Sequence, residues 1–594
     1  MLLTLKRFYA QLRLCVVFFF CGLLPLRAVE PAEISSPLWS QVEARRLWDD
    51  PEWWTLVHYH RTMWGRVESR IDDPRFFLHP RGKVNRKAEL KATLHAFLEP
   101  ESVGGERSLA CRFPARRQWL LEKLELPESV FPDGDCEDFH EAIAQLEIES
   151  AAMIYPAGYL NSPASMFGHL LLVLDRKDKD RLLSRAVNYA AVVGDSFGPL
   201  FAVKGIFGLY DGVFAILPYY DKVEEYSAVN RRDIWEYPLE LSETELDRLL
   251  RHVWELQELR SRYFFFKENC AFNLLYPIEA ARASVKLVRR FRMSAVPVSL
   301  LQQLAESGAT GEPVYRPSKA SVMRDLVSRL SPAEQERARV LMEGGALDGS
   351  ESAVLISFAI EWIQYLYTEK MITPEVYRER IFPLLSARSK LGRVETSVRE
   401  IPAAPDQGHA PRRLGVYGGV NTTEGDGFWG VTLRAAYHDW LDDPAGYPEG
   451  SSIRMFEVDV RGDMDEGEVY LRDFTLVDIR SQTPPELWVR PLSWAVRFSA
   501  EADPFDTGHH RMIGRFATGF TERLGANGLG YVMMSQLIRG DSDLDDHLGW
   551  EPGGEWGVLH ATSRLRAGVR GRHHWGVWGS SDVRHHVEAE IRLP

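Results

Sequence analysis

The last third of the chain alternates between apolar and polar residues with a period of two. The alternation is clear in segments 429–438, 492–501 and 583–593. A period of two is that of a β-strand with one apolar and one polar face. Segments of this kind, separated by Gly-, Asp- and Pro-rich turns, predict about eight to twelve antiparallel strands over residues 412–594. Such a pattern favours an outer-membrane β-barrel, although a soluble β-sandwich would alternate in the same way.

Helical spacing of apolar residues dominates two other regions, residues 29–105 and 297–395. The second region carries the capping-box pair Ser331 and Glu334, which is typical of a helix start. We therefore predict a helical N-terminal domain over 29–105 and a helical connector over 297–395. A Pro-, Ala- and Gly-rich stretch at 396–411 follows the connector and predicts a linker to the C-terminal strands.

Strands and helices alternate in the middle of the chain, from residue 106 to residue 296. Short apolar runs predict strands at 166–175, 184–193, 211–219 and 234–241. A capping box at Ser242 and Glu245 then predicts a helix that leads toward Cys270. The glycine-containing segment 204–212 lacks the Gly-Lys-Ser/Thr ending of a phosphate-binding loop, so we interpret it as a mobile loop at the mouth of a site.

The first 28 residues have the layout of a secretory signal peptide. Lys6, Arg7 and Arg13 precede an apolar core over 14–26, and Leu26-Arg27-Ala28 follows. The apolar core is shorter than the ~20 residues of a spanning helix, so we expect a signal that is removed after Ala28. Export places the chain in the cell envelope.

Export also changes how the cysteines are interpreted. Beyond the signal, the chain has only Cys111, Cys136 and Cys270. In an oxidising compartment we expect a disulfide between Cys111 and Cys136, which leaves Cys270 as a reactive thiol. The alternative is that all three thiols are free and buried.

Length and charge limit the possible functions. A chain of 594 residues is long enough for several domains. Its formal net charge is −13, and loss of the basic signal peptide would make the chain still more acidic. Nucleic acid is therefore not an expected partner, because binding it requires a basic surface.

Two stretches carry the candidate chemistry. His169 ends a turn-rich run and precedes the apolar segment 170–174, which places it at the mouth of a buried strand. Cys270 lies beside a helix, and the positive end of a helix would favour its thiolate. A histidine that takes a thiol proton and a thiolate that attacks a carbonyl are sufficient for acyl transfer. Taken singly, each residue could equally be a buried structural side chain.

The run Asn161-Ser-Pro-Ala-Ser-Met-Phe-Gly-His169, the strand Val187-Asn-Tyr-Ala190, the stretch 226–237 and Glu268-Asn-Cys270 together resemble the Lnb N-terminal periplasmic domain family. That family is similar to circularly permuted papain-like proteins, including lecithin:retinol acyltransferase, in which a strand histidine precedes a helix cysteine. The resemblance covers residues 106–296. It implies a multidomain chain with an α+β permuted papain-like thiol domain, flanking helical segments and a C-terminal antiparallel β-barrel.

The resemblance also implies roles for individual residues. His169 would be the general base, Cys270 the nucleophile and Asn188 the group that orients the imidazole. The backbone N–H of Cys270 would hold the oxyanion, while Ser162 and Ser165 would cap the turn before His169. No metal ion or organic cofactor is implied.

These observations lead to three functional hypotheses. The first is a thiol acyltransferase or hydrolase of a Gram-negative-type envelope, with a periplasmic thiol domain on an outer-membrane barrel. It would act on acyl esters or amides of lipids or lipoproteins. The family's namesake, a lipoprotein N-acyltransferase, continues into membrane helices where this sequence has alternating strands. The second hypothesis is a peptidoglycan peptidase or amidase that uses the same dyad, and the third is a non-catalytic, barrel-anchored binding scaffold.

Overall fold

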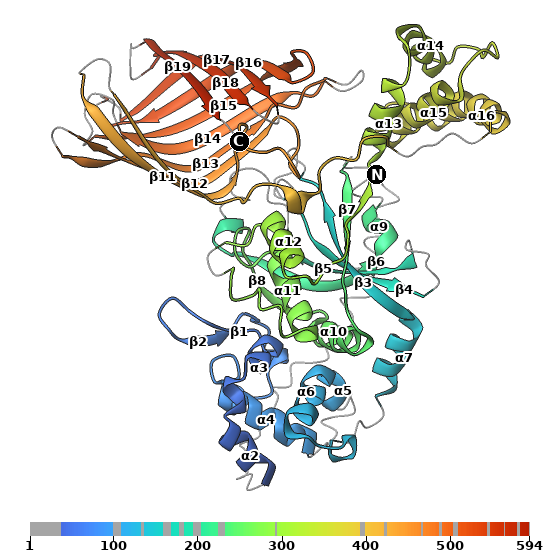
Figure 1. Ribbon diagram of the computed structural model, residues 1–594, viewed down its shortest axis with the longest axis vertical. Helices are drawn as coiled ribbons and strands as arrows, with labels where there is room; N and C mark the ends of the chain where they lie inside the picture. The colour runs from blue at the N-terminus through green and yellow to red at the C-terminus, as the bar shows by residue number, and fades with distance from the viewer. Residues whose placement is uncertain are drawn as a thin grey trace. The chain divides into compact units, whose positions relative to one another are not determined.

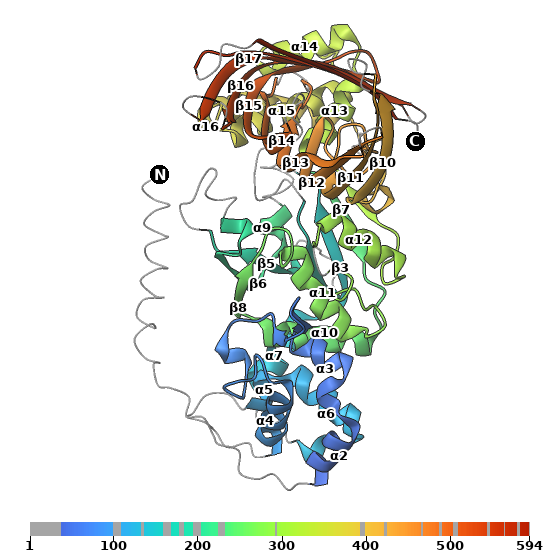
Figure 2. The ribbon, with the colours of Figure 1, turned by 90° about the vertical axis from the view of Figure 1, so that its left-hand side faces the viewer.

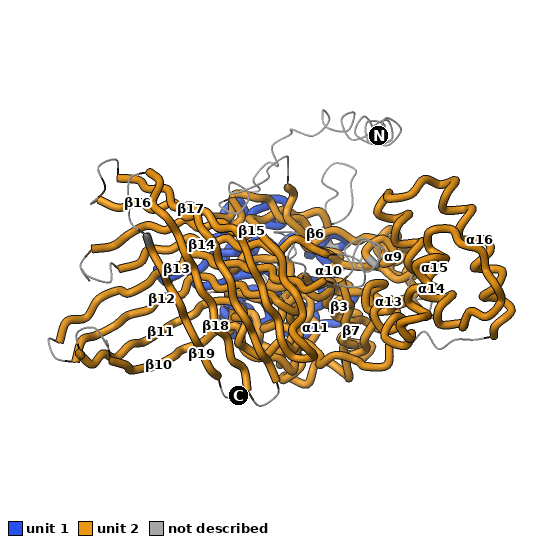
Figure 3. The backbone as a smooth tube through the Cα atoms, turned by 90° about the horizontal axis from the view of Figure 1, so that it is seen from above, with its two compact units in different colours: residues 1–136 blue, residues 137–594 orange. Residues whose placement is uncertain are grey.

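The structure is a computed structural model of the whole chain. The residues that it describes are 37–98, 109–131, 136–158, 168–177, 183–193, 204–223, 232–291, 294–392, 398–420, 425–464, 467–485, 490–502, 509–542, 544, 547–562, 565–578 and 583–592. The predicted signal peptide and the two turn serines, Ser162 and Ser165, lie outside these residues. The chain divides into two compact units, residues 1–136 and 137–594 (Figure 3).

The first unit is a small helical domain with one β-hairpin. Its helices are α2 (Pro37–Arg45), α3 (Pro51–Leu56), α4 (Arg86–Leu98), α5 (Leu109–Arg112) and α6 (Pro114–Leu124), and β1 (Tyr59–Arg61) pairs with β2 (Val67–Ser69). Trp53 and Trp119 stack in its core with ring centroids 5.3 Å apart. Buried Arg116 and Glu89 form an ion pair at 3.1 Å. Trp53 and Trp119 therefore serve packing, whereas Trp64 is 84% exposed.

A disulfide joins Cys111 and Cys136 in this first unit, and Cys270 is the free, buried cysteine of the described chain. This is the pairing that the odd number of exported cysteines leads one to expect. A disulfide stabilises a fold mainly by restricting the unfolded chain. Here it closes a loop between two cysteines that are 25 residues apart in the sequence.

The second unit begins with an α+β domain built on one antiparallel sheet (Figure 1). The strand order is β8-β6-β5-β4-β3-β7-β9. Its strands are β3 (Ile148–Pro156), β4 (Leu171–Arg176), β5 (Arg185–Ala191), β6 (Tyr210–Pro218), β7 (Ile234–Pro238), β8 (Arg260–Tyr263) and β9 (Val314–Arg316). The four strands predicted from apolar runs correspond to β4, β5, β6 and β7.

Helices α7 (Glu137–Leu146), α9 (Tyr219–Val223), α10 (Glu243–Leu256), α11 (Cys270–Ala281) and α12 (Pro297–Glu306) complete this domain. The predicted capping box is present, because the Ser242 side chain accepts from Glu245 N–H and the Glu245 side chain accepts from Ser242 N–H. Helix α11 packs against β4 and β5, and nearly all of its side chains are buried. The helix that begins at Cys270 is thus a core element.

The connector is helical, as predicted, with α13 (Lys319–Ser328), α14 (Pro332–Met342), α15 (Ala353–Thr368) and α16 (Pro374–Lys390) around one apolar core. Its capping box at Ser331 and Glu334 is also present. In the described part of the chain, no helix combines the length and apolar character needed to cross a membrane. The linker that follows is docked, since the Tyr237 hydroxyl donates to Asp406 at 2.6 Å.

The C-terminal region is a curled antiparallel sheet of ten strands in which each strand pairs with the next (Figures 1 and 2). The strands are β10 (Arg413–Val420), β11 (Gly427–His438), β12 (Ser451–Asp463), β13 (Val469–Ser481), β14 (Ser493–Ala502), β15 (His510–Arg523), β16 (Gly528–Gly540), β17 (Leu548–Ala561), β18 (Arg566–Trp575) and β19 (Val583–Arg592). Within the described residues, β10 and β19 are both edges, so the sheet is an open half-barrel, and the closed barrel that we predicted is not confirmed. The alternation sets which side chains share a face, but it carries no information on whether the first and last strands meet.

The two faces of this sheet are inverted relative to those of a soluble protein. On β16, Val532 and Met534 are 70% and 71% exposed, while Arg539 is buried. On β17, Trp556 and Val558 are half-exposed. Successive side chains of a strand point to opposite faces. One face is therefore apolar and exposed, and the other is charged and enclosed.

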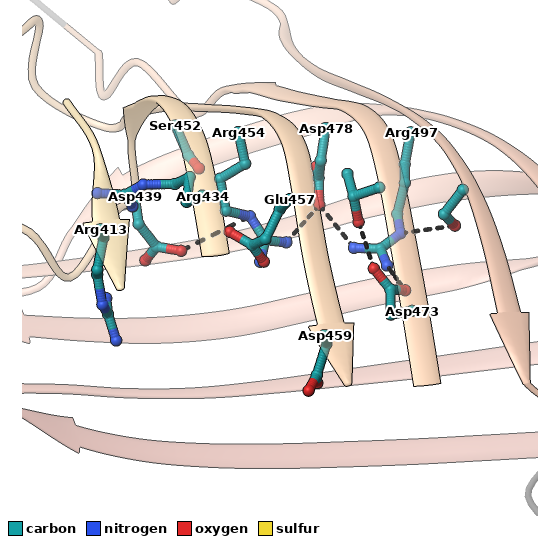
Figure 4. Close-up of polar contacts among 12 residues, drawn as sticks. Arg413, Arg434, Asp439, Ser452, Arg454, Glu457, Asp459, Asp473, Asp478 and Arg497 are labelled. Carbon is teal, nitrogen blue, oxygen red and sulfur yellow. Dashed lines mark hydrogen bonds and ion pairs between the residues drawn. The ribbon is translucent and has the colours of Figure 1, made fainter. Parts of the chain in front are cut away.

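The enclosed face is held together by ion pairs. Asp478 accepts from Arg454 at 2.6 Å and from Arg497 at 3.1 Å (Figure 4). Glu555 pairs with Arg515 at 2.9 Å, and all of these side chains are largely or fully buried. A buried charge without a partner is strongly destabilising. The pairing explains how the enclosed face can carry charged residues instead of an apolar core.

Candidate active site

His169 lies two residues before the start of β4 and directly follows Gly168. Gly168 has φ +81°, and a Cβ at this position would lie 2.6 Å from the ring of buried Tyr155. Only glycine fits both the conformation and the contact. The glycine thus fixes the backbone from which the His169 side chain projects, and the imidazole itself is half-buried.

Cys270 is the first residue of α11. The N-cap residue is Asn269, whose side-chain oxygen accepts from Phe272 N–H at 3.2 Å. The amide group of Asn269 also donates to the Ala295 carbonyl at 2.6 Å and to the Phe265 carbonyl at 3.0 Å. The thiol therefore sits at the partly positive end of a well-capped, buried helix, which favours its charged form.

The structure brings His169, Asn188 and Cys270 together. The Asn188 side-chain oxygen lies 3.0 Å from His169 Nε2. Because an amide oxygen only accepts, Nε2 carries the proton in this arrangement, and Nδ1 is left to take the proton of the thiol. Asn188 comes from β5, a central strand of the sheet, so the orienting group is on a rigid element.

The surroundings of Cys270 favour the thiolate. Burial by itself would raise the pKa of this thiol, but the charge of His169 and its hydrogen bond to the thiol lower it, as do the Leu170 N–H and the Tyr263 hydroxyl. The outcome is a pKa of about 7. Roughly half of the thiol would thus be ionised near neutral pH, which is the state required of a nucleophile.

Tyr263, at the end of β8, is a site residue that we did not predict. Its hydroxyl oxygen accepts from the backbone N–H of Cys270 at 3.2 Å, the group that we expected to hold the oxyanion. In the sequence Tyr263 opens the run Tyr-Phe-Phe-Phe, which is most simply interpreted as apolar packing. The only available signal was a hydroxyl within an aromatic run seven residues before the cysteine.

The segment 204–212 differs from the loop that the sequence predicts. Residues 204–206 form a helical turn, and β6 already begins at Tyr210. Leu209 N–H donates to the Lys204 carbonyl, and Phe265 N–H donates to the Gly205 carbonyl, each at 2.9 Å. The segment is therefore attached to the residues that lead to Cys270. Its mobility stays a prediction.

One cluster in the described residues has metal-ligand character. His409, His438 and Asp442 place one potential ligand atom each within 4.8 Å of one another. However, the Asp442 carboxylate pairs with Arg434 and Arg592 at 2.6 Å each, and His409 Nε2 lies 2.8 Å from His438 Nδ1. Two guanidinium groups disfavour a cation there. We interpret the cluster as a polar contact that fastens the linker to β11.

Comparison with known families agrees with this architecture. Residues 138–307, which contain the thiol site, match the family model of the Lnb N-terminal periplasmic domain. Three other segments match domains of unknown function: 45–123 (DUF7843), 313–400 (DUF7842) and 402–594 (DUF7840). No match was found among curated proteins or among solved structures. The chain thus combines a segment that matches a periplasmic-domain family with a half-barrel sheet, which fits an envelope protein of the Gram-negative type.

Proposed function

We propose that the chain is a cysteine-dependent acyltransferase or hydrolase of the cell envelope, with its active site in residues 138–307. The observation that carries the proposal is the convergence of Cys270, His169 and Asn188 in one buried site. The order of a strand histidine before a helix cysteine agrees with a permuted papain-like fold. A scaffold that only binds a ligand would not need a thiol of lowered pKa.

The chemistry follows from the contacts. His169 Nδ1 takes the proton of Cys270, and the thiolate attacks the acyl carbonyl to form a tetrahedral intermediate. When the carbon–heteroatom bond breaks, the imidazolium gives its proton to the leaving alcohol or amine, and an acyl thioester remains on Cys270. Water or an amine of an acceptor then attacks the thioester, His169 again takes a proton, and the thiol is restored.

Exposed apolar side chains beside the site favour a lipid substrate. Phe207 and Leu209 are each 67% exposed, and Val192 is 60% exposed. Val192 directly follows β5 and Leu209 directly precedes β6, and a backbone hydrogen bond of 2.7 Å from Val192 N–H to the Asp211 carbonyl joins these two strand ends. The segment that carries Phe207 also contacts Phe264, because a Cβ at Gly208 would lie 2.3 Å from the Phe264 ring. An acyl chain is the substrate portion that such side chains would bind.

The inverted sheet favours a place in the outer membrane. Its exposed face is apolar and its enclosed face is charged, as in strands that face lipid outside and a polar interior. Four exposed tryptophans, Trp429, Trp550, Trp575 and Trp578, lie at the sheet end opposite to Arg413 and Arg592. Tryptophan at one end of the strands is typical of a membrane–water interface. We therefore assign that end to a membrane–water interface.

Closure of the half-barrel is part of the proposal. Arg413, the first residue of β10, and Arg592, the last residue of β19, both pair with the same oxygen of Asp442, at 3.5 and 2.6 Å. In a closed antiparallel barrel with an even number of strands these two ends are neighbours. We propose that β10 and β19 pair along their remaining length in the membrane.

Ester hydrolysis by the full chain in detergent tests the proposed activity. We expect turnover of p-nitrophenyl esters with a preference for long over short acyl chains, because the apolar side chains bind the chain. The Cys270→Ala variant should give only the background rate. Cleavage of wall peptides in place of acyl esters would favour the peptidase hypothesis, and no turnover of either class would favour the binding scaffold.

A further inference from the structure

We propose that Tyr263 is a catalytic residue, whose hydroxyl group stabilises first the Cys270 thiolate and then the oxyanion of the tetrahedral intermediate. The inference rests on the proposed function of Cys270. In this role the Tyr263 hydroxyl replaces the backbone N–H of Cys270, which we expected to be the oxyanion donor, because that N–H already donates to the Tyr263 oxygen.

The contacts fix where the Tyr263 hydroxyl proton points. The hydroxyl oxygen accepts from Cys270 N–H at 3.2 Å, and the hydroxyl also forms a hydrogen bond with the Cys270 thiol. An O–H group has one proton to donate. With its oxygen bonded to the N–H, that proton is directed at the sulfur atom, which is the reacting atom.

Packing holds the Tyr263 ring in this position. The ring stacks on Tyr189 with centroids 5.6 Å apart and planes at 17°, and it makes an edge contact with Phe265 at 6.1 Å. The Tyr189 hydroxyl is bonded to Ser261 at 2.7 Å. Tyr189 follows Asn188 in β5, so one strand supports both the histidine partner and the tyrosine. A preorganised donor of this kind is what oxyanion stabilisation requires.

Tyr263 remains a donor during the reaction. Burial, and next the negative charge of Cys270, raise its pKa well above the ordinary value of tyrosine. The phenol therefore keeps its proton wherever Cys270 is ionised. When sulfur bonds to the acyl carbon, the negative charge moves from sulfur to the carbonyl oxygen. The Tyr263 O–H, without losing its proton, then donates to that oxygen until the leaving group departs.

A purely structural role would make different predictions. If Tyr263 only caps the N–H of Cys270, then removal of its hydroxyl would lower stability and leave the ionisation of the thiol unchanged. A catalytic role predicts a change in the pH dependence of Cys270. Tyr315→Phe is a matched control, because it removes a hydroxyl that donates to Asp233 at 3.0 Å on β9, an edge strand of the same sheet.

The test compares Tyr263→Phe and Tyr315→Phe in the full chain in detergent. Iodoacetamide labelling of Cys270 across pH reports the thiolate without any need for a substrate. We expect Tyr263→Phe to move the labelling midpoint to higher pH and to slow ester turnover by about 100-fold, the usual loss for one oxyanion donor. Tyr315→Phe should change neither quantity. An unchanged midpoint and turnover in Tyr263→Phe would overturn the proposal.

A second variant covers the case in which Tyr263→Phe does not fold. Difluorotyrosine at position 263 keeps the ring and makes the hydroxyl a stronger donor, so the labelling midpoint should move to lower pH. No movement would contradict the role of Tyr263. This inference and the proposed function fail in different ways. If the proposed function is wrong, wild type and Cys270→Ala turn over esters equally. If only this inference is wrong, wild type still turns over esters faster than Cys270→Ala.

Discussion

Replacement of His169 by alanine should move the midpoint of Cys270 labelling from about 7 to above the ~8.5 of an ordinary cysteine. The direction follows from the contacts of the thiol. Burial raises its pKa, and the charge and hydrogen bond of His169 are the main opposing influences. Without them the buried environment dominates, and the thiol stays protonated at neutral pH. Ester turnover should fall by about 10⁴-fold or more, because base and thiolate are lost together.

Two further variants make this prediction specific. Asn188→Ala should shift the labelling midpoint less and cost less turnover, since Asn188 contacts Nε2 and acts only through the imidazole. His140→Ala is the matched control, because His140 is an exposed histidine of the same domain in α7. Labelling curves that coincide for wild type and His169→Ala would mean that the histidine does not activate the cysteine.

The second large effect concerns the half-barrel. Val532→Arg should destabilise the sheet by about 2–4 kcal/mol in lipid vesicles, the cost of arginine on the lipid face near mid-membrane. Val532 is 70% exposed in the middle of β16. At such a position of a soluble protein, the same change would alter stability by only about 0.5 kcal/mol. Unfolding is titrated with urea in vesicles and monitored by protease protection of residues 413–592. This measures the difference in the free energy of unfolding between wild type and Val532→Arg.

Val340→Arg provides the comparison for this substitution. Val340 is an exposed valine of α14, in the helical connector, and arginine there should be tolerated in water. If Val532→Arg is as mild as Val340→Arg, then the apolar face of the sheet does not contact lipid. The membrane placement of the chain would then have to be abandoned, while the thiol chemistry would stand.

Local sequence patterns predicted the elements of this chain well. The capping boxes at Ser242 and Ser331 form as expected because both partners of each lie within one helical turn. The apolar runs around 171–174 and 234–237 predicted buried strands, again because the pattern lies within a few consecutive residues. Alternation predicted the C-terminal strands, since each strand has one face toward an enclosed space and one away from it.

What the sequence could not predict depends on residues far apart in the chain. The Arg480 and Glu555 pair joins strands 75 residues apart, and closure of the sheet depends on where β10 and β19 lie. Tyr263 becomes a site residue only because the bend after β8 returns its hydroxyl to the start of α11. The roles of His169, Asn188 and Cys270 came from a family resemblance, and no spacing rule would have selected Asn188.

The most direct test of the central claim is the mass of the intact full chain after incubation with a long-chain acyl thioester and an acid quench. We predict a gain of one acyl group on Cys270, removal of that group by neutral hydroxylamine, and no gain in Cys270→Ala. An acyl group on another residue, or an unmodified Cys270 that still reacts with iodoacetamide, would show that the site does not form the acyl-enzyme on which the proposed function depends.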